Sequence, residues 1–180
     1  ISHFENSFYI VSNIDNAQNF KLSKTSENNT EKTNWVDVIS HRDDVLLEGV
    51  DIFKDFLVVS ERENGLNKIK ISTWDKSTSY YLPFNSETYT AYTTSNIDFE
   101  TTKLRYGYQS LVTPSSVIEF DMITKEKHVL KEQEVLDVDF NKENYTSKRL
   151  WANASDGSKI PISLVHHVDT EINSNTPLLL

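Results

Sequence analysis

Three short stretches recur along the chain at a constant spacing: FYIVS at residues 8–12, FLVVS at residues 56–60 and LRYGY at residues 104–108. Each begins 48 residues after the one before it. A fixed period is a stronger guide to architecture than local propensity, because every copy must form the same structural unit. The sequence therefore predicts a repeat over its first three quarters.

Further strands are predicted within each copy, where apolar and polar residues alternate with the period of two that marks a β-strand. A second strand is predicted at residues 20–23, 69–72 and 118–121. A shorter third strand follows at residues 36–39, 80–83 and 128–130. Strands that open the second and third copies are predicted at residues 50–53 and 97–99. Turn-forming residues such as Asn64-Gly65 separate the paired strands and predict hairpins.

Four short strands in one 48-residue copy are typical of a β-propeller blade. A β-sandwich also has strands at this spacing, but it does not require three copies in register. We therefore expect an all-β fold, in which residues 1–135 form a partial β-propeller of about three four-stranded blades. Three blades cannot close a ring, so we expect the remaining blades outside these residues.

The repeat ends after residue 135, and the polar, acidic stretch 136–146 predicts an interdomain connector. Hinge residues must absorb backbone changes without loss of packed core. Asp137, Asp139 and Asn141 meet that condition because they are polar enough to stay solvated, so they are the candidate hinge residues.

A hairpin is predicted after the connector, with strands at residues 149–154 and 160–165 around the turn Asp156-Gly157. The chain begins at Ile1 and ends on the apolar run 177–180, which predicts the start of a buried strand that would join the hairpin's sheet. We therefore expect a fragment of a longer protein, in which residues 147–180 form the first strands of a second domain.

Composition excludes several classes of function. The net charge of −9 argues against nucleic-acid binding, which relies on clustered Lys and Arg. With no cysteine, the chain has no thiol nucleophile, disulfide or cysteine-bound zinc. None of its four glycines begins a nucleophile elbow, a dinucleotide loop or a P-loop, and no apolar run is long enough to cross a membrane. We therefore expect no cofactor, no metal and no membrane partner.

A long block of residues resembles the prolyl oligopeptidase family of serine peptidases, and within it the oligopeptidase B (protease II) group. The block includes residues 104–108, 113–114, 129–131, 134–135, 150–152, 156–157, 161–165 and 177–179, together with Tyr145 and Ser147. Residues 1–95 match more loosely, mainly through the blade repeat. Lys125 departs from the family, which commonly has glycine there, and Leu136-Asp137 stands where Pro-Gly is common.

The resemblance implies that a propeller caps an α/β-hydrolase domain, and that this chain covers the last blades, the connector and the first catalytic strands. It implies a parent enzyme that cleaves short peptides after Arg or Lys, with the propeller gating substrate access. The family's Ser, Asp and His, and its oxyanion tyrosine, come later than Leu180, so no catalytic, cofactor-binding or metal-binding residue is assigned here. The resemblance favours a cytoplasmic location, with the periplasm as the alternative.

Arg105, Tyr106 and Tyr108 lie on an inner-type blade strand and are candidates for lining a central channel, with packing as the alternative. His166 and His167 cannot bind one metal together, because adjacent residues on a strand point to opposite faces. Two other functions stay open. The chain could be a stand-alone propeller that binds proteins, or, given its many Asn, Ser and Thr residues, an extracellular carbohydrate-binding β domain.

Overall fold

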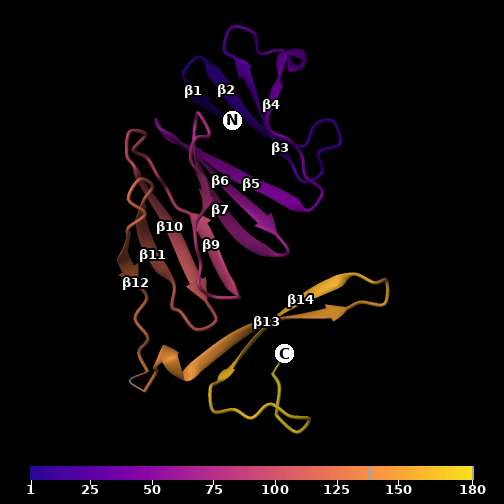
Figure 1. Cartoon of the computed structure of the whole chain (residues 1–180), viewed down its shortest axis with the longest axis vertical. Coiled ribbons are helices and arrows are strands. Elements are labelled where there is room, and N and C mark those ends of the chain that lie inside the picture. The colour runs from indigo at the N-terminus through magenta and orange to yellow at the C-terminus, as the bar shows by residue number, and fades with distance from the viewer. Residues whose placement is uncertain (138, 180) are drawn as a thin grey trace.

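Three four-stranded antiparallel sheets and one hairpin form the structure, a computed structural model that describes residues 1–137 and 139–179 (Figure 1). The first blade consists of β1 (Ser2–Phe4), β2 (Ser7–Ser12), β3 (Lys21–Ser26) and β4 (Val36–Ile39). The second consists of β5 (Val45–Ile52), β6 (Phe56–Glu63), β7 (Leu66–Thr73) and β8 (Ser79–Tyr81). The third consists of β9 (Tyr89–Thr93), β10 (Lys103–Ser110), β11 (Ser116–Asp121) and β12 (Lys127–Glu132), and the hairpin of β13 (Tyr145–Asn153) and β14 (Lys159–His167).

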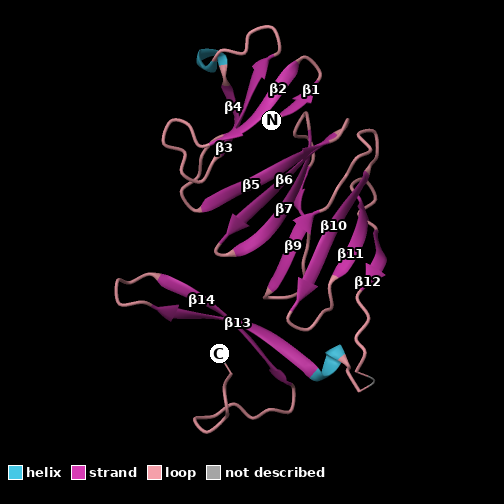
Figure 2. Cartoon of the chain, turned by 180° about the vertical axis from the view of Figure 1, so that it is seen from behind, coloured by secondary structure: helices cyan, strands magenta, loops and turns pink. Residues whose placement is uncertain are grey.

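Every blade is a meander, because the order of strands in each sheet follows the order of the chain. The only helices in the described residues are two single turns of 3-10 helix, η1 (Lys32–Asn34) and η2 (Lys142–Asn144) (Figure 2). The prediction of an all-β partial propeller is therefore confirmed. None of the described helices is long and apolar enough to cross a membrane.

Two apolar cores hold the three blades together, one on each face of the second blade. Tyr9 and Leu22 of the first blade pack with Leu57 and Val59, while Phe56 and Val58 of the second pack with the third. At the edge of the first core, the rings of Phe4 and Trp74 stack with their centroids 4.4 Å apart. Burial of both faces explains why β6 begins with four consecutive apolar residues, since alternation is lost when a strand has no solvent face.

The three repeated stretches lie on the equivalent strands β2, β6 and β10, but a shift of 48 residues does not keep their side chains on the same face. Phe8 and Phe56 lie on the equivalent strands β2 and β6, yet Phe56 faces the following blade and Phe8 faces away from it. The residues that share a face are Ile10, Leu57 and Leu104, which are 47 residues apart. A shift of one residue reverses the face of every side chain, and a strand buried on both faces gives no alternation to fix the register.

Two strand predictions are wrong. The third blade opens with β9 and not with residues 97–99, which form a loop where Ile97 is 92% exposed. Residues 97–99 alternate between apolar and polar as a strand does, but none of the described strands pairs with them. Leu178 and Leu179 are also outside any strand, and Leu180 lies outside the described residues. The described chain leaves them without a partner strand, which a β-ladder requires.

Lys125, where the resembled family commonly has glycine, lies in a turn with a positive φ of 65°. That left-handed conformation carries no steric cost only for glycine. Its ammonium group lies 4.6 Å from the centroid of the Tyr80 ring, a cation–π contact that a glycine could not make.

Candidate functional site

The hairpin β13–β14 crosses the ends of the second and third blades and forms a junction with them (Figure 1). The backbone N–H of Arg149 donates to the Glu87 carboxylate at 2.9 Å. The Arg149 guanidinium donates to the carbonyl of Asn64 in the β6–β7 turn. The hydroxyls of Ser86 and Ser147 lie 3.4 Å apart, and either can donate. The junction thus joins the hairpin to both blades through polar contacts.

The backbone conformation of the β6–β7 turn allows the Arg149 side chain to approach it closely. Asn64 and Gly65 have φ values of 51° and 76°, the left-handed pair that a two-residue hairpin turn requires. A Cβ on Gly65 would lie 3.1 Å from Nη2 of Arg149 and 3.6 Å from Cγ of Pro161, so glycine lets the hairpin approach closely. The guanidinium also lies 5.0 Å from the Trp151 ring, which holds it at the turn.

An aromatic cluster lies beside this junction, made of Phe84, Tyr89, Tyr106 and Tyr108. The Phe84 ring centroid lies 4.6 Å from that of Tyr89 and 5.6 Å from that of Tyr108. Burial and then the neighbouring Tyr108 raise the pKa of Tyr89, while Arg149 opposes this increase. Its hydroxyl donates to the Asn67 carbonyl at 2.9 Å. The three phenols, whose pKa values are all raised by burial, therefore stay protonated at neutral pH, and Tyr89 acts as a hydrogen-bond donor.

The three predicted channel residues lie in different environments. Tyr106 is 1% exposed and packs in the core between the second and third blades. Tyr108 is half-buried at the edge of that core. Arg105 is exposed on the opposite face of β10, where its Nε and the Lys103 ammonium each lie 3.1 Å from the Glu119 carboxylate. The packing interpretation fits Tyr106, and a channel role for Arg105 stays a prediction.

The predicted hinge residues are exposed, and their hydrogen bonds within the described residues are local. The Asp137 carboxylate accepts the backbone N–H of Asp139 at 3.0 Å. The Asn141 side chain accepts the N–H of Glu143 at 3.0 Å and so caps η2. Such contacts can re-form after a backbone rotation, and the hinge role stays a prediction.

The described residues contain no group of three metal-ligating side chains and no serine hydroxyl bonded to a histidine. His166 Nδ1 lies 2.8 Å from the His167 carbonyl, and His167 Nδ1 lies 3.6 Å from the Asp169 carboxylate. Sequence reasoning missed Arg149, Glu87 and Asn64 as a group, since only the Asn64-Gly65 turn gave a signal in the sequence.

The described chain is similar to known proteins along nearly its whole length. It is 36% identical over 178 residues to dipeptidyl aminopeptidase BI of Pseudoxanthomonas mexicana, covering 98% of this chain and 24% of that protein. It is 26% identical over 180 residues to Protease 2 of Moraxella lacunata, covering 100% of this chain and 25% of that protein. The chain thus spans about a quarter of the length of these curated relatives.

Solved structures show the same architecture. Oligopeptidase B from Trypanosoma brucei, in a closed form with covalently bound antipain, superposes with a TM-score of 0.82 at 27% identity. The match covers 95% of this chain and 25% of that one. The family described as "Prolyl oligopeptidase, N-terminal beta-propeller domain" matches residues 1–133. The chain therefore belongs to the prolyl oligopeptidase family and carries strands of its N-terminal β-propeller domain.

Proposed function

We propose that this chain is part of a serine oligopeptidase that hydrolyses short peptides after Arg or Lys, and that its blades restrict access to the catalytic site. Similarity to Protease 2 and to a structure of oligopeptidase B supports this specificity. The net charge of −9 is compatible with basic peptides. The catalytic Ser, Asp and His would be supplied by chain that follows residue 180.

The observation that carries the proposal is the junction made by Arg149. A two-stranded hairpin has little core of its own, and this one is anchored to the blades through Glu87 and Asn64. In the proposed enzyme, a catalytic domain built onto the hairpin would lie against the ends of the blades. Peptides would reach it through the propeller or through the gap that opens when the two domains separate.

A second candidate is a dipeptidyl aminopeptidase, which would release two residues from a free N-terminus. Its support is the 36% identity to dipeptidyl aminopeptidase BI. The two candidates differ in whether the substrate must carry a free amino group two residues before the cleaved bond. An N-terminally blocked peptide therefore separates them.

The test uses the protein encoded by the whole reading frame that contains residues 1–180. Three reporter amides are compared: a blocked arginyl peptide, a blocked prolyl peptide and a free dipeptide. Cleavage of the blocked arginyl reporter at the highest kcat/KM supports the oligopeptidase. Preference for the free dipeptide selects the second candidate, and preference for the prolyl reporter contradicts Arg/Lys specificity. No hydrolysis of any reporter would favour the stand-alone interaction module.

Gating is tested on the same protein by locking the blades to the catalytic domain with an engineered disulfide. We expect slower turnover of peptides, while the serine still reacts with a small phosphonylating inhibitor. Loss of both reactions would show damage to the active site, and unchanged peptide turnover would show that domain opening is not the entry route. We also propose a cytoplasmic location, which cell fractionation tests.

A further inference from the structure

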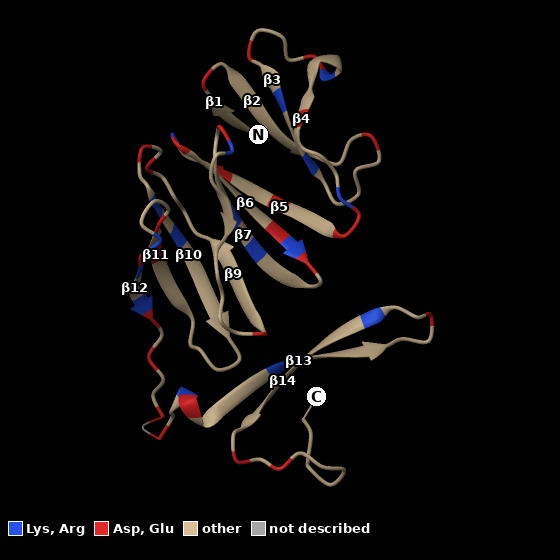
Figure 3. Ribbon diagram, in the orientation of Figure 1, with Lys and Arg blue, Asp and Glu red and all other residues tan. Residues whose placement is uncertain are grey.

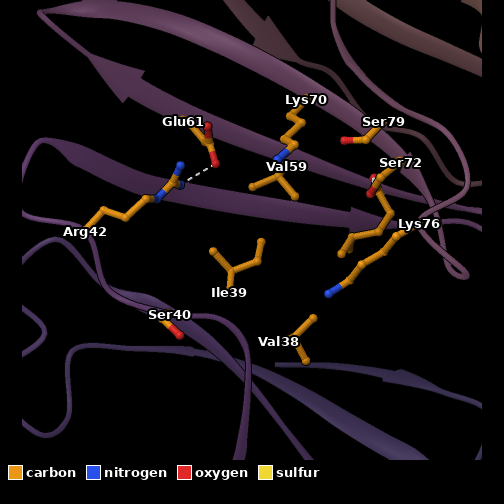
Figure 4. Close-up of a pocket in the computed structure, with 11 residues that line it drawn as sticks. Val38, Ile39, Ser40, Arg42, Val59, Glu61, Lys70, Ser72, Lys76 and Ser79 are labelled. Carbon is orange, nitrogen blue, oxygen red and sulfur yellow. Dashed lines mark hydrogen bonds and ion pairs between the residues drawn. The ribbon is translucent and has the colours of Figure 1, made fainter.

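A groove separates the first and second blades on the side of β4 and β8 (Figure 4). Its volume is about 400 Å³, and its apolar floor is formed by Val38, Ile39, Leu57 and Val59. Both blades belong to this chain, so the groove does not depend on the rest of the propeller or on a catalytic domain.

Three basic side chains, Arg42, Lys70 and Lys76, line this groove. Among the residues that the structure describes, Glu61 is the only acidic one that lines the groove, and it is 2% exposed and already paired. One Glu61 oxygen accepts the Arg42 guanidinium and the other accepts the Tyr81 hydroxyl at 2.8 Å. The groove therefore holds two positive charges without a paired carboxylate, in a chain whose net charge is −9 and whose acidic residues are spread over strands and loops (Figure 3).

Lys70 and Lys76 carry those two charges. Within residues 1–137 and 139–179, neither ammonium group has a carboxylate within 4.0 Å or a hydrogen-bond acceptor. Lys70 lies 5.7 Å from the centroid of the Tyr81 ring, a contact that leaves its N–H donors free. A cationic rim above an apolar floor complements a ligand that has a carboxylate at one end and an apolar group beside it.

Polar groups on the groove walls favour a peptide over a fatty acid. Ser40, Ser72 and Ser79 line the groove, and a hydrocarbon tail could not bond to their hydroxyls; that of Ser72 already donates to the Leu57 carbonyl at 3.4 Å and can still accept. The strands on either side, β4 and β8, are the last strands of their sheets, so each has one unpaired backbone edge. Unpaired edges can hydrogen-bond the amides of an extended peptide.

We propose that this groove binds the C-terminal carboxylate of a peptide whose last side chains are apolar. Lys70 and Lys76 bind the carboxylate, the last side chain packs on the partly exposed Val38 and Ile39, and serine hydroxyls bond the final peptide groups. The site lies between blades, so it would bind a peptide without cleaving it. It is independent of the proposed peptidase activity.

The probe is N-acetyl-leucyl-leucine, compared with its C-terminal amide, and binding is followed through the methyl NMR signals of the full chain. We expect the acid to shift the signals of Ile39, Leu57 and Val59, and the amide to bind about tenfold more weakly. Added salt should weaken binding of the acid and leave binding of the amide unchanged, since partly exposed charges are screened. Equal binding of acid and amide would overturn the proposal.

Variants and competing anions complete the test. The double variant Lys70→Gln/Lys76→Gln should lose the preference for the acid, with an unchanged circular dichroism spectrum. Lys131→Gln is the matched control, because Lys131 is an exposed lysine on β12 of the third blade. Octanoate or inorganic phosphate binding as tightly as the peptide acid would overturn the assignment to a peptide. Unchanged binding in the double variant would also overturn it. Since no readout uses hydrolysis, failure here would leave the proposed peptidase function untouched.

Discussion

Arg149 and Glu87 lie 62 residues apart in the sequence, yet the backbone N–H of Arg149 donates to the Glu87 carboxylate at 2.9 Å. The guanidinium of the same residue donates to the Asn64 carbonyl, 85 residues away. A single residue therefore uses both its backbone and its side chain to attach β13 to two separate loops of the blades. A bond from a charged group is stronger than one between neutral groups, so Arg149 is the principal contact of the junction.

Replacing Arg149 by Ala should loosen the hairpin and leave the blades intact. The lost side-chain bond is exposed, so we expect local opening to become easier by about 1 kcal/mol, roughly a fivefold faster amide exchange over residues 145–167. Hydrogen exchange with mass spectrometry measures this. Lys148→Ala is the control, because Lys148 is the exposed neighbour on the same strand. Equal exchange in the two variants would show that Arg149 does not hold the junction.

Gly107 lies beneath the ring of Tyr92, and a Cβ at this position would be 2.4 Å from the Tyr92 Cζ atom. Gly107→Ala should therefore lower the free energy of unfolding by about 1 kcal/mol, because the exposed ring must move away. In a Tyr92→Ala background the same change should be neutral or stabilising, since glycine weakens a strand interior. Urea denaturation of the double-mutant cycle measures the coupling.

Gly49→Ala provides the matched control for Gly107, because nothing lies within 4 Å of a Cβ built at Gly49 in β5. We expect no loss of stability in this variant. A similar loss in both alanine variants would mean that the cost comes from the backbone and not from the Tyr92 ring.

Glu61 is 2% exposed and bonds both Arg42 and Tyr81, so Glu61→Ala leaves a partly buried guanidinium without its partner. Removing one member of a buried pair costs about 3–5 kcal/mol, and the one-third exposure of Arg42 reduces our expectation to about 2 kcal/mol. Urea denaturation measures this loss. Glu61→Leu combined with Arg42→Leu should recover most of it, since two apolar side chains leave no unpaired charge. A double variant as unstable as Glu61→Ala would contradict this account.

Burial and then the neighbouring Tyr108 raise the pKa of Tyr106 from 10.0 to about 12. The unfolded chain loses this proton at lower pH than the folded chain does. Tyr106 therefore contributes stability that is complete below pH 10 and is lost as the pH rises to about 12. Tyr106→Phe should reduce this loss while leaving stability at neutral pH nearly unchanged. Thermal unfolding between pH 10 and about 12 measures the loss of stability, and tyrosinate absorbance follows the ionisation. An identical loss of stability in Tyr106→Phe would contradict its attribution to Tyr106.

The sequence by itself determined the unit of the fold. Alternating strands, the Asn64-Gly65 turn and a regular repeat are local patterns, so they indicated four-stranded blades before any contact was known. The hairpin around Asp156-Gly157 followed from the same local chemistry. Family membership was also accessible, because the resembling residues occur in one order along the chain.

Only the tertiary structure decided which face each side chain occupies and which residues meet across the chain. Phe8 and Phe56 look equivalent in the sequence but face opposite ways. The sequence does not reveal this, because β6 is buried on both sides and its unbroken apolar run does not indicate which residues lie on which face. Arg149 bonds Asn64 and Glu87, and Glu61 bonds Arg42, although the partners lie on separate segments of the chain. Such pairs depend on how the blades pack against one another, and local propensities do not determine that packing.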